Sequence, residues 1–158
     1  MFERAVASHT ADPASSRAVC PGDVIGELDI PRLHLSGTIV EGDDDTTLAV
    51  GIGHLRDTPL PWDTGNSALA AHRDAFFRPL KDAAAGDMVR LRTVAGTFTY
   101  RVVRTAIVDP QDLSVIQGSE RPTLTLITCY PFSYIGRAPR RFVVQAERIG
   151  ATRPAEPQ

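Results

Sequence analysis

The chain has 158 residues, with 17 basic and 19 acidic side chains, so its formal net charge at pH 7 is -2. This length suits one domain with a substantial core, and the near-neutral charge argues against a general nucleic-acid-binding function. No stretch approaches the roughly 18–20 apolar residues of a membrane span, and the start does not resemble a signal peptide. We therefore expect the chain as it stands to be soluble and to bind no nucleic acid.

The two ends of the chain differ in composition from the middle. Residues 1–21 include the run Thr-Ala-Asp-Pro-Ala-Ser-Ser, which is typical of a linker, and residues 151–158 have the composition of a tail. The sequence therefore predicts a single folded domain over residues 22–150.

Short segments of alternating or β-branched residues predict a series of strands in that domain. They are Val24–Ile30, Gly37–Val40, Ser67–His72, Met88–Val94, Thr97–Val108, Thr123–Cys129 and Arg141–Arg148. The fourth and fifth segments form a hairpin that turns at Ala95-Gly96. Strands at this spacing, with little helix between them, predict an all-β fold built as a closed or nearly closed antiparallel barrel.

Helical segments are predicted to be brief. One covers Asp45–Val50, with Asp45 or Thr46 as its N-cap, and another covers Ala75–Leu80, with Asp74 as its N-cap.

The strand that ends in Cys129 is the most informative part of the chain. Pro131 prevents simple continuation of this strand, and a second strand begins after a short loop, near Arg141. If the two strands pair antiparallel, Cys129 and Arg141 become lateral neighbours. A nearby cation favours the thiolate, which is the nucleophilic form of cysteine. A lone cysteine can equally be a small buried hydrophobic residue, and this segment by itself leaves both interpretations open.

A cysteine nucleophile needs a partner that accepts or donates a proton, and histidine is the usual one. His9 lies in the linker and His34 lies near an early strand, so both are most simply surface residues. His72 is favoured over His54 because it ends an apolar strand, as Cys129 does, and catalytic groups gather at such strand ends.

Other acidic and cysteine residues have simpler explanations. Asp74 could suggest a Cys–His–Asp triad, but it lies only two residues after His72 and suits a helix cap. The run Asp43-Asp44-Asp45 could suggest calcium, yet three consecutive acids cannot all point one way, and a turn into a helix explains them better. The spacing of Cys20 and Cys129 supports neither a disulfide nor a metal site. We expect no metal ion and no cofactor.

Three separated runs of this sequence together resemble the sortases, the cysteine transpeptidases that attach surface proteins to bacterial cell envelopes. The runs are Ala-His-Arg-Asp-Ala-Phe-Phe-Arg-Pro-Leu at 71–80, Leu-Ile-Thr-Cys-Tyr-Pro-Phe at 126–132 and Ala-Pro-Arg-Arg-Phe-Val-Val at 138–144. The first two are similar to class D members in particular. The resemblance spans about residues 22–149 and implies that residues 22–150 form a sortase catalytic domain, an eight-stranded barrel with short helices and 3-10 turns.

The resemblance also implies a catalytic triad. Cys129 matches the nucleophile, His72 the histidine and Arg141 the arginine. Arg140 competes for the last role, but the family places its arginine directly before the apolar run of the final strand, where Arg141 stands. Side chains alternate along a strand, so only one of these two arginines can face Cys129.

The activity implied by the resemblance is transpeptidation of a sorting signal of the Leu-Pro-x-Thr-Gly or Leu-Pro-x-Thr-Ala kind. The acceptor would be an amine of peptidoglycan or of a pilin, and the site of action the extracytoplasmic face of the bacterial membrane. Sortases are normally tethered by a hydrophobic segment before the barrel, and this chain shows none. Either the anchor has been removed or this is an unusual soluble form; the linker-like residues 1–21 favour removal. We expect a monomer.

The substrate groove is expected between the segments that flank the catalytic strands. One wall is predicted at residues 108–113 with the turn at 117–122, and the other at residues 130–140, although each could simply be a connection of the barrel. The candidate substrate-binding residues are Asp112, Leu113, Thr128, Tyr130, Phe132 and His54. For His54, a supporting position beside the active site is the alternative.

Two other functions are compatible with a β-rich cysteine protein. An L,D-transpeptidase would have a Ser-x-Gly-Cys motif and a His-Gly pair, whereas here Thr128 precedes Cys129 and Arg73 follows His72. A barrel that only binds peptides, without catalysis, would not need the cysteine, histidine and arginine together.

Overall fold

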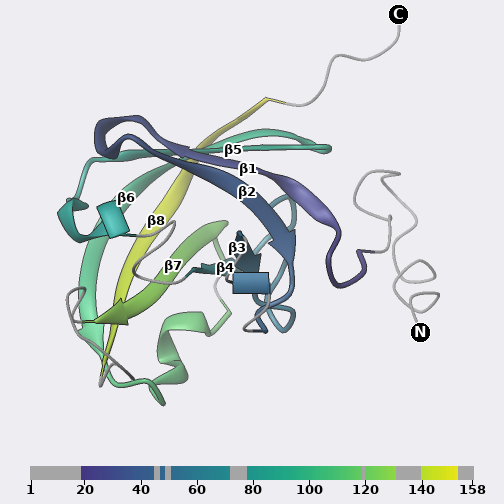
Figure 1. The fold of residues 1–158 in the computed structure, drawn as a ribbon. Helices are drawn as coiled ribbons and strands as arrows, with labels where there is room; N and C mark the ends of the chain where they lie inside the picture. The colour runs from purple at the N-terminus through teal and green to yellow at the C-terminus, as the bar shows by residue number, and fades with distance from the viewer. Residues whose placement is uncertain are drawn as a thin grey trace, which may run out of the picture.

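Eight strands and three 3-10 helices are present in the part of the chain that the computed structural model describes (Figure 1). The described residues are 19–44, 47–48, 51–71, 78–118, 120–130 and 140–152. The strands are β1 (Val24–Ile30), β2 (Leu35–Glu41), β3 (Ile52–His54), β4 (Asn66–Ala70), β5 (Met88–Thr93), β6 (Gly96–Val108), β7 (Thr123–Tyr130) and β8 (Arg140–Thr152), and the 3-10 helices are η1 (Pro31–Leu33), η2 (Arg78–Asp82) and η3 (Leu113–Ile116).

The strands close into one barrel in the order β1-β2-β3-β4-β7-β8-β6-β5, and β5 pairs with β1 to complete it. The predicted all-β barrel is confirmed, but the prediction that it is antiparallel is wrong in two places. β2 pairs parallel with β3, and β4 pairs parallel with β7. Parallel neighbours need a crossover connection, and the long segments between these strands supply it. Local residue patterns carry no information on such pairings.

The predicted strands differ from the observed ones at a few ends. β3 escaped prediction because its three residues, Ile-Gly-His, are too few to show alternation. β4 ends at Ala70, so the predicted continuation is absent at Ala71, and His72 lies outside the described residues. β8 continues to Thr152 and so includes two residues that the composition assigned to the tail.

The predicted helices fall only partly on described residues. Thr47 and Leu48 are helical, and the side chain of Asp44 accepts hydrogen bonds from the Thr47 amide (3.3 Å) and hydroxyl (2.8 Å). These bonds lower the pKa of Asp44. The observed cap is therefore one residue earlier than predicted. Of the second helix, the described part is the 3-10 helix η2, and its predicted cap Asp74 lies outside the described residues.

The core fills the barrel with aliphatic side chains from nearly every strand. On β5 the buried residues alternate with exposed ones, as a two-sided strand requires, whereas β1 alternates only after the register shift near Val24. Fully buried side chains include Leu28, Ile39, Leu91, Leu124 and Leu126. Each such side chain contributes about 1.5–3 kcal/mol relative to an exposed position, so the core holds the strands that carry the candidate site in place.

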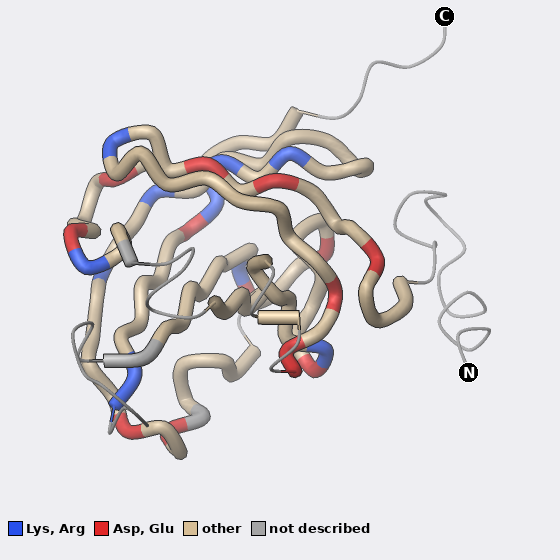
Figure 2. The backbone as a smooth tube through the Cα atoms, in the orientation of Figure 1, with Lys and Arg blue, Asp and Glu red and all other residues tan. Residues whose placement is uncertain are grey.

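Acidic and basic residues are interspersed along the described part of the chain (Figure 2). Two cross-strand pairs join β1 and β5: Arg90 lies 3.2 Å from Asp29, and Arg92 lies 4.0 Å from Glu27. Exposed pairs of this kind stabilise a fold by only about 0–1 kcal/mol each. These two ion pairs therefore contribute little to the stability of the barrel.

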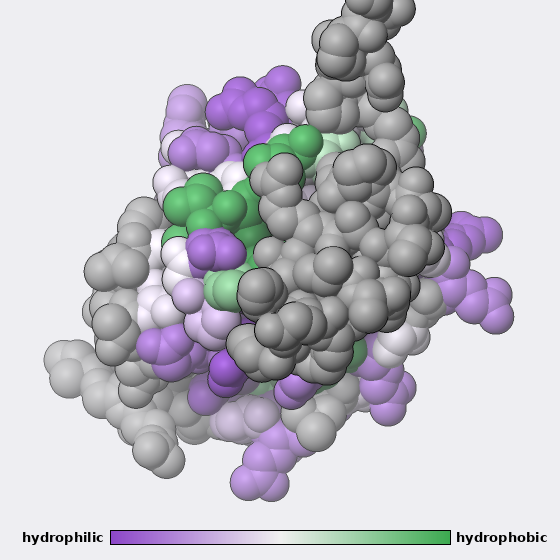
Figure 3. Space-filling model, turned by 90° about the vertical axis from the view of Figure 1, so that its right-hand side faces the viewer, coloured by the Kyte–Doolittle hydropathy of each residue, from purple (hydrophilic) through white to green (hydrophobic). Residues whose placement is uncertain are grey.

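Some large hydrophobic side chains are exposed, including Val24, Val94 and Ile149. Figure 3 shows a face of the molecule on which hydrophobic surface gathers in one area with polar residues beside it. No helix in the described part of the chain has the length and apolar character needed to cross a bilayer.

Candidate active site

The pairing of β7 with β8 places the backbone of Cys129 directly opposite Arg141. The strands are antiparallel, and Tyr130 opposite Arg140 is the next pair in the register. The predicted lateral neighbourhood of Cys129 and Arg141 is thus confirmed at the level of the backbone. His72 and Phe132, the other predicted residues of this region, lie outside the described residues.

The two arginines at the start of β8 differ in their surroundings. Arg141 is half-buried and lines a pocket, and its Nη1 donates a hydrogen bond to the Arg140 carbonyl at 3.1 Å. Arg140 is exposed and does not line that pocket. Alternation along the strand produces this difference, as the sequence predicted.

The pocket beside Arg141 has a volume of about 180 Å³. Ile127 of β7 and Val143 of β8, which are paired in the register, line it from the sheet. Its walls come from Leu55 and from the connection between β6 and β7, which contributes Val115 and Ile116 of η3. The described lining is mainly apolar and also includes Arg141, Asp109 and Asp112; the aliphatic part suits a peptide with apolar side chains.

Asp112 lines the same pocket and also caps η3. Its carboxylate accepts hydrogen bonds from the Ser114 amide (3.0 Å) and hydroxyl (2.6 Å), and these bonds lower the pKa of Asp112. Part of the predicted wall at residues 108–113 therefore lines the pocket, and Leu113 is the first residue of η3. Of the turn at 117–122, predicted as part of the same wall, the described residues 117–118 and 120–122 do not line it.

Thr128 does not fit its predicted contact with substrate. It is 2% exposed, it pairs with the buried Phe142, and its hydroxyl has no hydrogen-bond partner. Because neighbouring residues of a strand point to opposite faces, Thr128 lies on the face opposite to Ile127 and the pocket.

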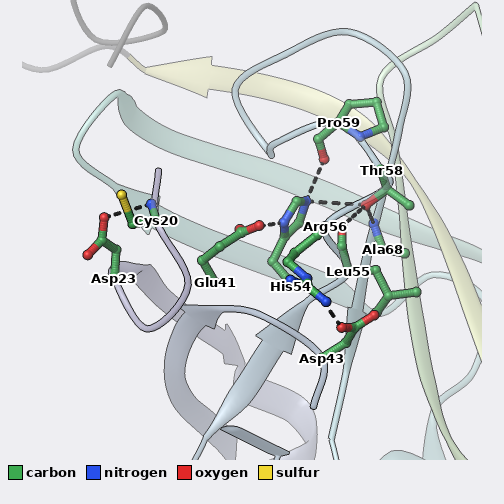
Figure 4. Close-up of polar contacts among 10 residues, drawn as sticks. All are labelled: Cys20, Asp23, Glu41, Asp43, His54, Leu55, Arg56, Thr58, Pro59 and Ala68. Carbon is green, nitrogen blue, oxygen red and sulfur yellow. Dashed lines mark hydrogen bonds and ion pairs between the residues drawn. The ribbon is translucent and has the colours of Figure 1, made fainter. Parts of the chain in front are cut away.

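His54 is buried in a polar network (Figure 4). Its Nδ1 lies 2.7 Å from Oε1 of Glu41, and its Nε2 lies 2.8 Å from the Pro59 carbonyl and 3.2 Å from the Thr58 hydroxyl. His54 is 1% exposed, and this burial argues against the predicted direct contact with substrate. The alternative, a supporting position beside the site, agrees with the network.

The acceptors around His54 determine where its protons lie. The Pro59 carbonyl cannot donate, and the Thr58 hydroxyl already donates to the Leu55 carbonyl at 2.8 Å, so Nε2 of His54 must carry a hydrogen. On the other side of the ring, Nδ1 of His54 lies within hydrogen-bond distance of the Glu41 carboxylate. The network therefore holds the turn after β3, and with it Leu55 in the pocket wall.

Sequence reasoning missed several residues of this region. Leu55, Val115 and Ile116 line the pocket, and Glu41 holds His54. Isolated aliphatic residues in connections give no local signal, whereas an acid at the end of a buried strand, as Glu41 is, could have prompted a search for a buried partner.

Among the described residues, no cluster of three or more His, Cys, Asp or Glu side chains is arranged to hold a metal ion. Of the acidic run, Asp43 lies 3.7 Å from Arg56, and Asp44 is the helix cap. Cys20 is a free thiol.

Comparisons with known proteins agree on one family. Residues 28–149 match the sortase domain. Over 129 residues the chain is 42% identical to sortase D of Bacillus subtilis, which covers 81% of this chain and 65% of that protein. It is 29% identical to sortase A of Streptococcus agalactiae over 78% of this chain and 52% of the relative. The chain thus spans about half to two thirds of the length of these relatives.

A solved structure supports the same conclusion. The Clostridium perfringens sortase D5 transpeptidase superposes with a TM-score of 0.78 at 26% identity, over 94% of this chain and 94% of that chain. The domain match covers most of the chain, and the barrel places a cysteine of β7 opposite an arginine of β8. On this evidence, the chain belongs to the sortase family.

Proposed function

We propose that this protein is a cysteine transpeptidase that cleaves a sorting signal after its threonine and transfers the acyl part to an amine. The observation that carries the proposal is the register of Cys129 opposite Arg141 beside an apolar pocket, within a sortase domain. The relatives named sortase support the reaction class.

The proposed reaction has two steps. The Cys129 thiolate attacks the threonine carbonyl carbon, and Arg141 stabilises the oxyanion together with a backbone N–H. The C–N bond then breaks as His72 gives its proton to the leaving amine, which leaves a thioacyl enzyme. In the second step an acceptor amine attacks the thioester, its proton passes to His72, and the C–S bond breaks to release a new amide.

The pocket supports a substrate with an apolar part before the scissile bond. Ile127, Val143, Val115 and Leu55 present aliphatic surface that a Leu-Pro pair can cover. We propose a signal of the Leu-Pro-x-Thr-Gly or Leu-Pro-x-Thr-Ala kind. The acceptor would be an amine of peptidoglycan or of a pilin, and the protein would act as a monomer at the extracytoplasmic face of the membrane.

The test is cleavage of a small panel of peptides that carry these signals, read by mass spectrometry with and without an added amine. We expect cleavage after threonine, and a product in which the added amine replaces the leaving glycine or alanine. The variants Cys129→Ala and His72→Ala should each abolish both products. Near-normal turnover by His72→Ala would contradict the catalytic role of His72. If only the hydrolysed peptide forms, even with added amine, the protein is a hydrolase and not a transpeptidase.

A further inference from the structure

A set of buried and half-buried polar side chains holds one wall of the pocket. The Val115 carbonyl of η3 accepts hydrogen bonds from Nδ2 of Asn66 at 2.9 Å and from Nε2 of Gln145 at 3.2 Å. Nδ2 of Asn66 also donates to the Gln117 carbonyl at 3.1 Å. Side chains from β4 and β8 thus converge on the backbone of one short 3-10 helix.

Each of these two amides is oriented by its own partner. The Thr125 hydroxyl donates to Oδ1 of Asn66 at 2.6 Å, which turns the Asn66 amide nitrogen toward η3. Nε of Arg104 donates to Oε1 of Gln145 at 2.6 Å and does the same for Gln145. An amide whose oxygen is occupied in this way has only its N–H groups left for the carbonyls.

Burial raises the free-energy cost of losing these hydrogen bonds. Asn66 is 3% exposed and Thr125 is 0% exposed, so a donor or acceptor that loses its partner there cannot turn to bulk water. A fully satisfied network of this kind selects one conformation of the segment that it holds.

The network lies on the same face of the sheet as the candidate active site. Along β7 and β8 the cross-strand pairs are Thr125 with Gln145, then Ile127 with Val143, then Cys129 with Arg141. The middle pair lines the pocket. At about 3.3 Å per residue, the network lies roughly 13 Å along the strands from the Cys129 pair, too far to take part in the chemistry.

We propose that Asn66, Thr125 and Gln145, here called the η3 clamp, are positioning residues for substrate affinity. The clamp fixes Val115 and Ile116 as a preformed wall against the apolar part of the peptide. The conformational entropy of these residues is then lost when the protein folds, so it does not weaken peptide binding. This inference rests on the proposed function, because it assigns the pocket to the sorting signal.

The decisive variant is Thr125→Val, which keeps the side-chain volume but leaves Oδ1 of Asn66 without its donor. It also removes the longer contacts of the hydroxyl with the Val115 carbonyl (3.3 Å) and with Nε2 of Gln145 (3.4 Å). We expect KM for a sorting-signal peptide to rise about five- to tenfold, the effect of roughly one lost hydrogen bond, while kcat stays within about twofold. Alkylation of Cys129 by iodoacetamide should keep its rate. Hydrogen–deuterium exchange of residues 113–118 should accelerate, with β7 and β8 unchanged.

The matched control is Ser67→Ala, one residue from Asn66 on β4. Ser67 is 2% exposed, and its hydroxyl has no hydrogen-bond partner, so its loss should change neither KM nor the exchange of residues 113–118. If Thr125→Val fails to fold, Gln145→Leu provides the second variant, because Gln145 is only half-buried and its loss still removes a donor to Val115.

The outcomes separate the clamp from the proposed function. Unchanged exchange of residues 113–118 in both clamp variants would overturn the clamp itself. Faster exchange with an unchanged KM would show a merely structural role and overturn the assignment to affinity. A wild-type protein that cleaves no peptide of the panel would overturn the proposed function, and the link to KM with it.

Discussion

Arg140 and Arg141 show how strongly one position along a strand changes the environment of a side chain. Both are guanidinium groups at the start of β8, yet only Arg141 lines the pocket, and only Arg141 lies opposite Cys129 in the register. An alternation of two residues per repeat produces this contrast without any difference in chemistry.

We therefore expect Arg141→Ala to lower kcat/KM for the sorting-signal peptide by about 10²–10³-fold, the usual loss when one oxyanion donor is removed. Arg140→Ala is the matched control and should stay within about threefold of wild type. Initial rates with a fluorescence-quenched peptide measure both. Equal losses in the two variants would contradict the oxyanion role and favour a shared electrostatic one.

At the scale of elements, the short strand β3 depends on a close backbone approach. A Cβ atom built on Gly53 would lie 2.2 Å from the Gly42 carbonyl oxygen and 2.6 Å from Cδ2 of Leu48. The Gly42 amide in turn donates to the His54 carbonyl at 3.0 Å. Absence of a side chain at residue 53 thus lets the segment after β2 pack on β3, which positions His54 and the turn that carries Leu55.

Gly53→Ala should destabilise the protein by about 2 kcal/mol or more, because the clash is with backbone that cannot move cheaply. Gly150→Ala is the control: it also lies in a strand, and nothing stands within 4 Å of its added Cβ, so stability should change by less than about 0.5 kcal/mol. Urea denaturation followed by circular dichroism gives both values. A Gly53→Ala protein as stable as Gly150→Ala would contradict the close packing.

At the scale of the whole molecule, one ion pair ties together parts of the chain that are far apart in sequence. Arg32 of η1 binds Asp87 through Nε and through Nη2, the latter at 2.9 Å from Oδ2, and Asp87 also accepts from the Ala84 amide at 2.8 Å. The hydrogen bond from Arg32 is the largest cause of a lowered pKa of Asp87.

A lowered carboxyl pKa makes stability fall in acid. The carboxylate of Asp87 contributes its full stabilisation above the unfolded-state pKa of roughly 3.9, and this contribution is lost as the pH falls through the lower folded-state pKa. We expect the unfolding free energy of wild type to drop below about pH 4, and Asp87→Asn to be less stable at pH 7 with a flatter acid limb. Chemical denaturation from pH 7 to pH 3 tests this, and parallel curves would contradict it.

The local residue pattern determined most of the strands and, with the family resemblance, the pairing of Cys129 with Arg141. Alternation and strand-ending residues are local features of the chain, so they can be recognised in the sequence without knowledge of the tertiary structure. Alternation also showed that only one of Arg140 and Arg141 can face Cys129, and the family resemblance selected Arg141.

Only the tertiary structure decided the parallel pairings, the burial of His54 and Thr128, and the polar side chains under η3. Asn66 and Gln145 are 79 residues apart in the sequence. Both reach the Val115 carbonyl because β4 and β8 both border β7. Burial and hydrogen-bond partnership depend on which segments the barrel brings together, and that is set by long-range packing of the whole chain.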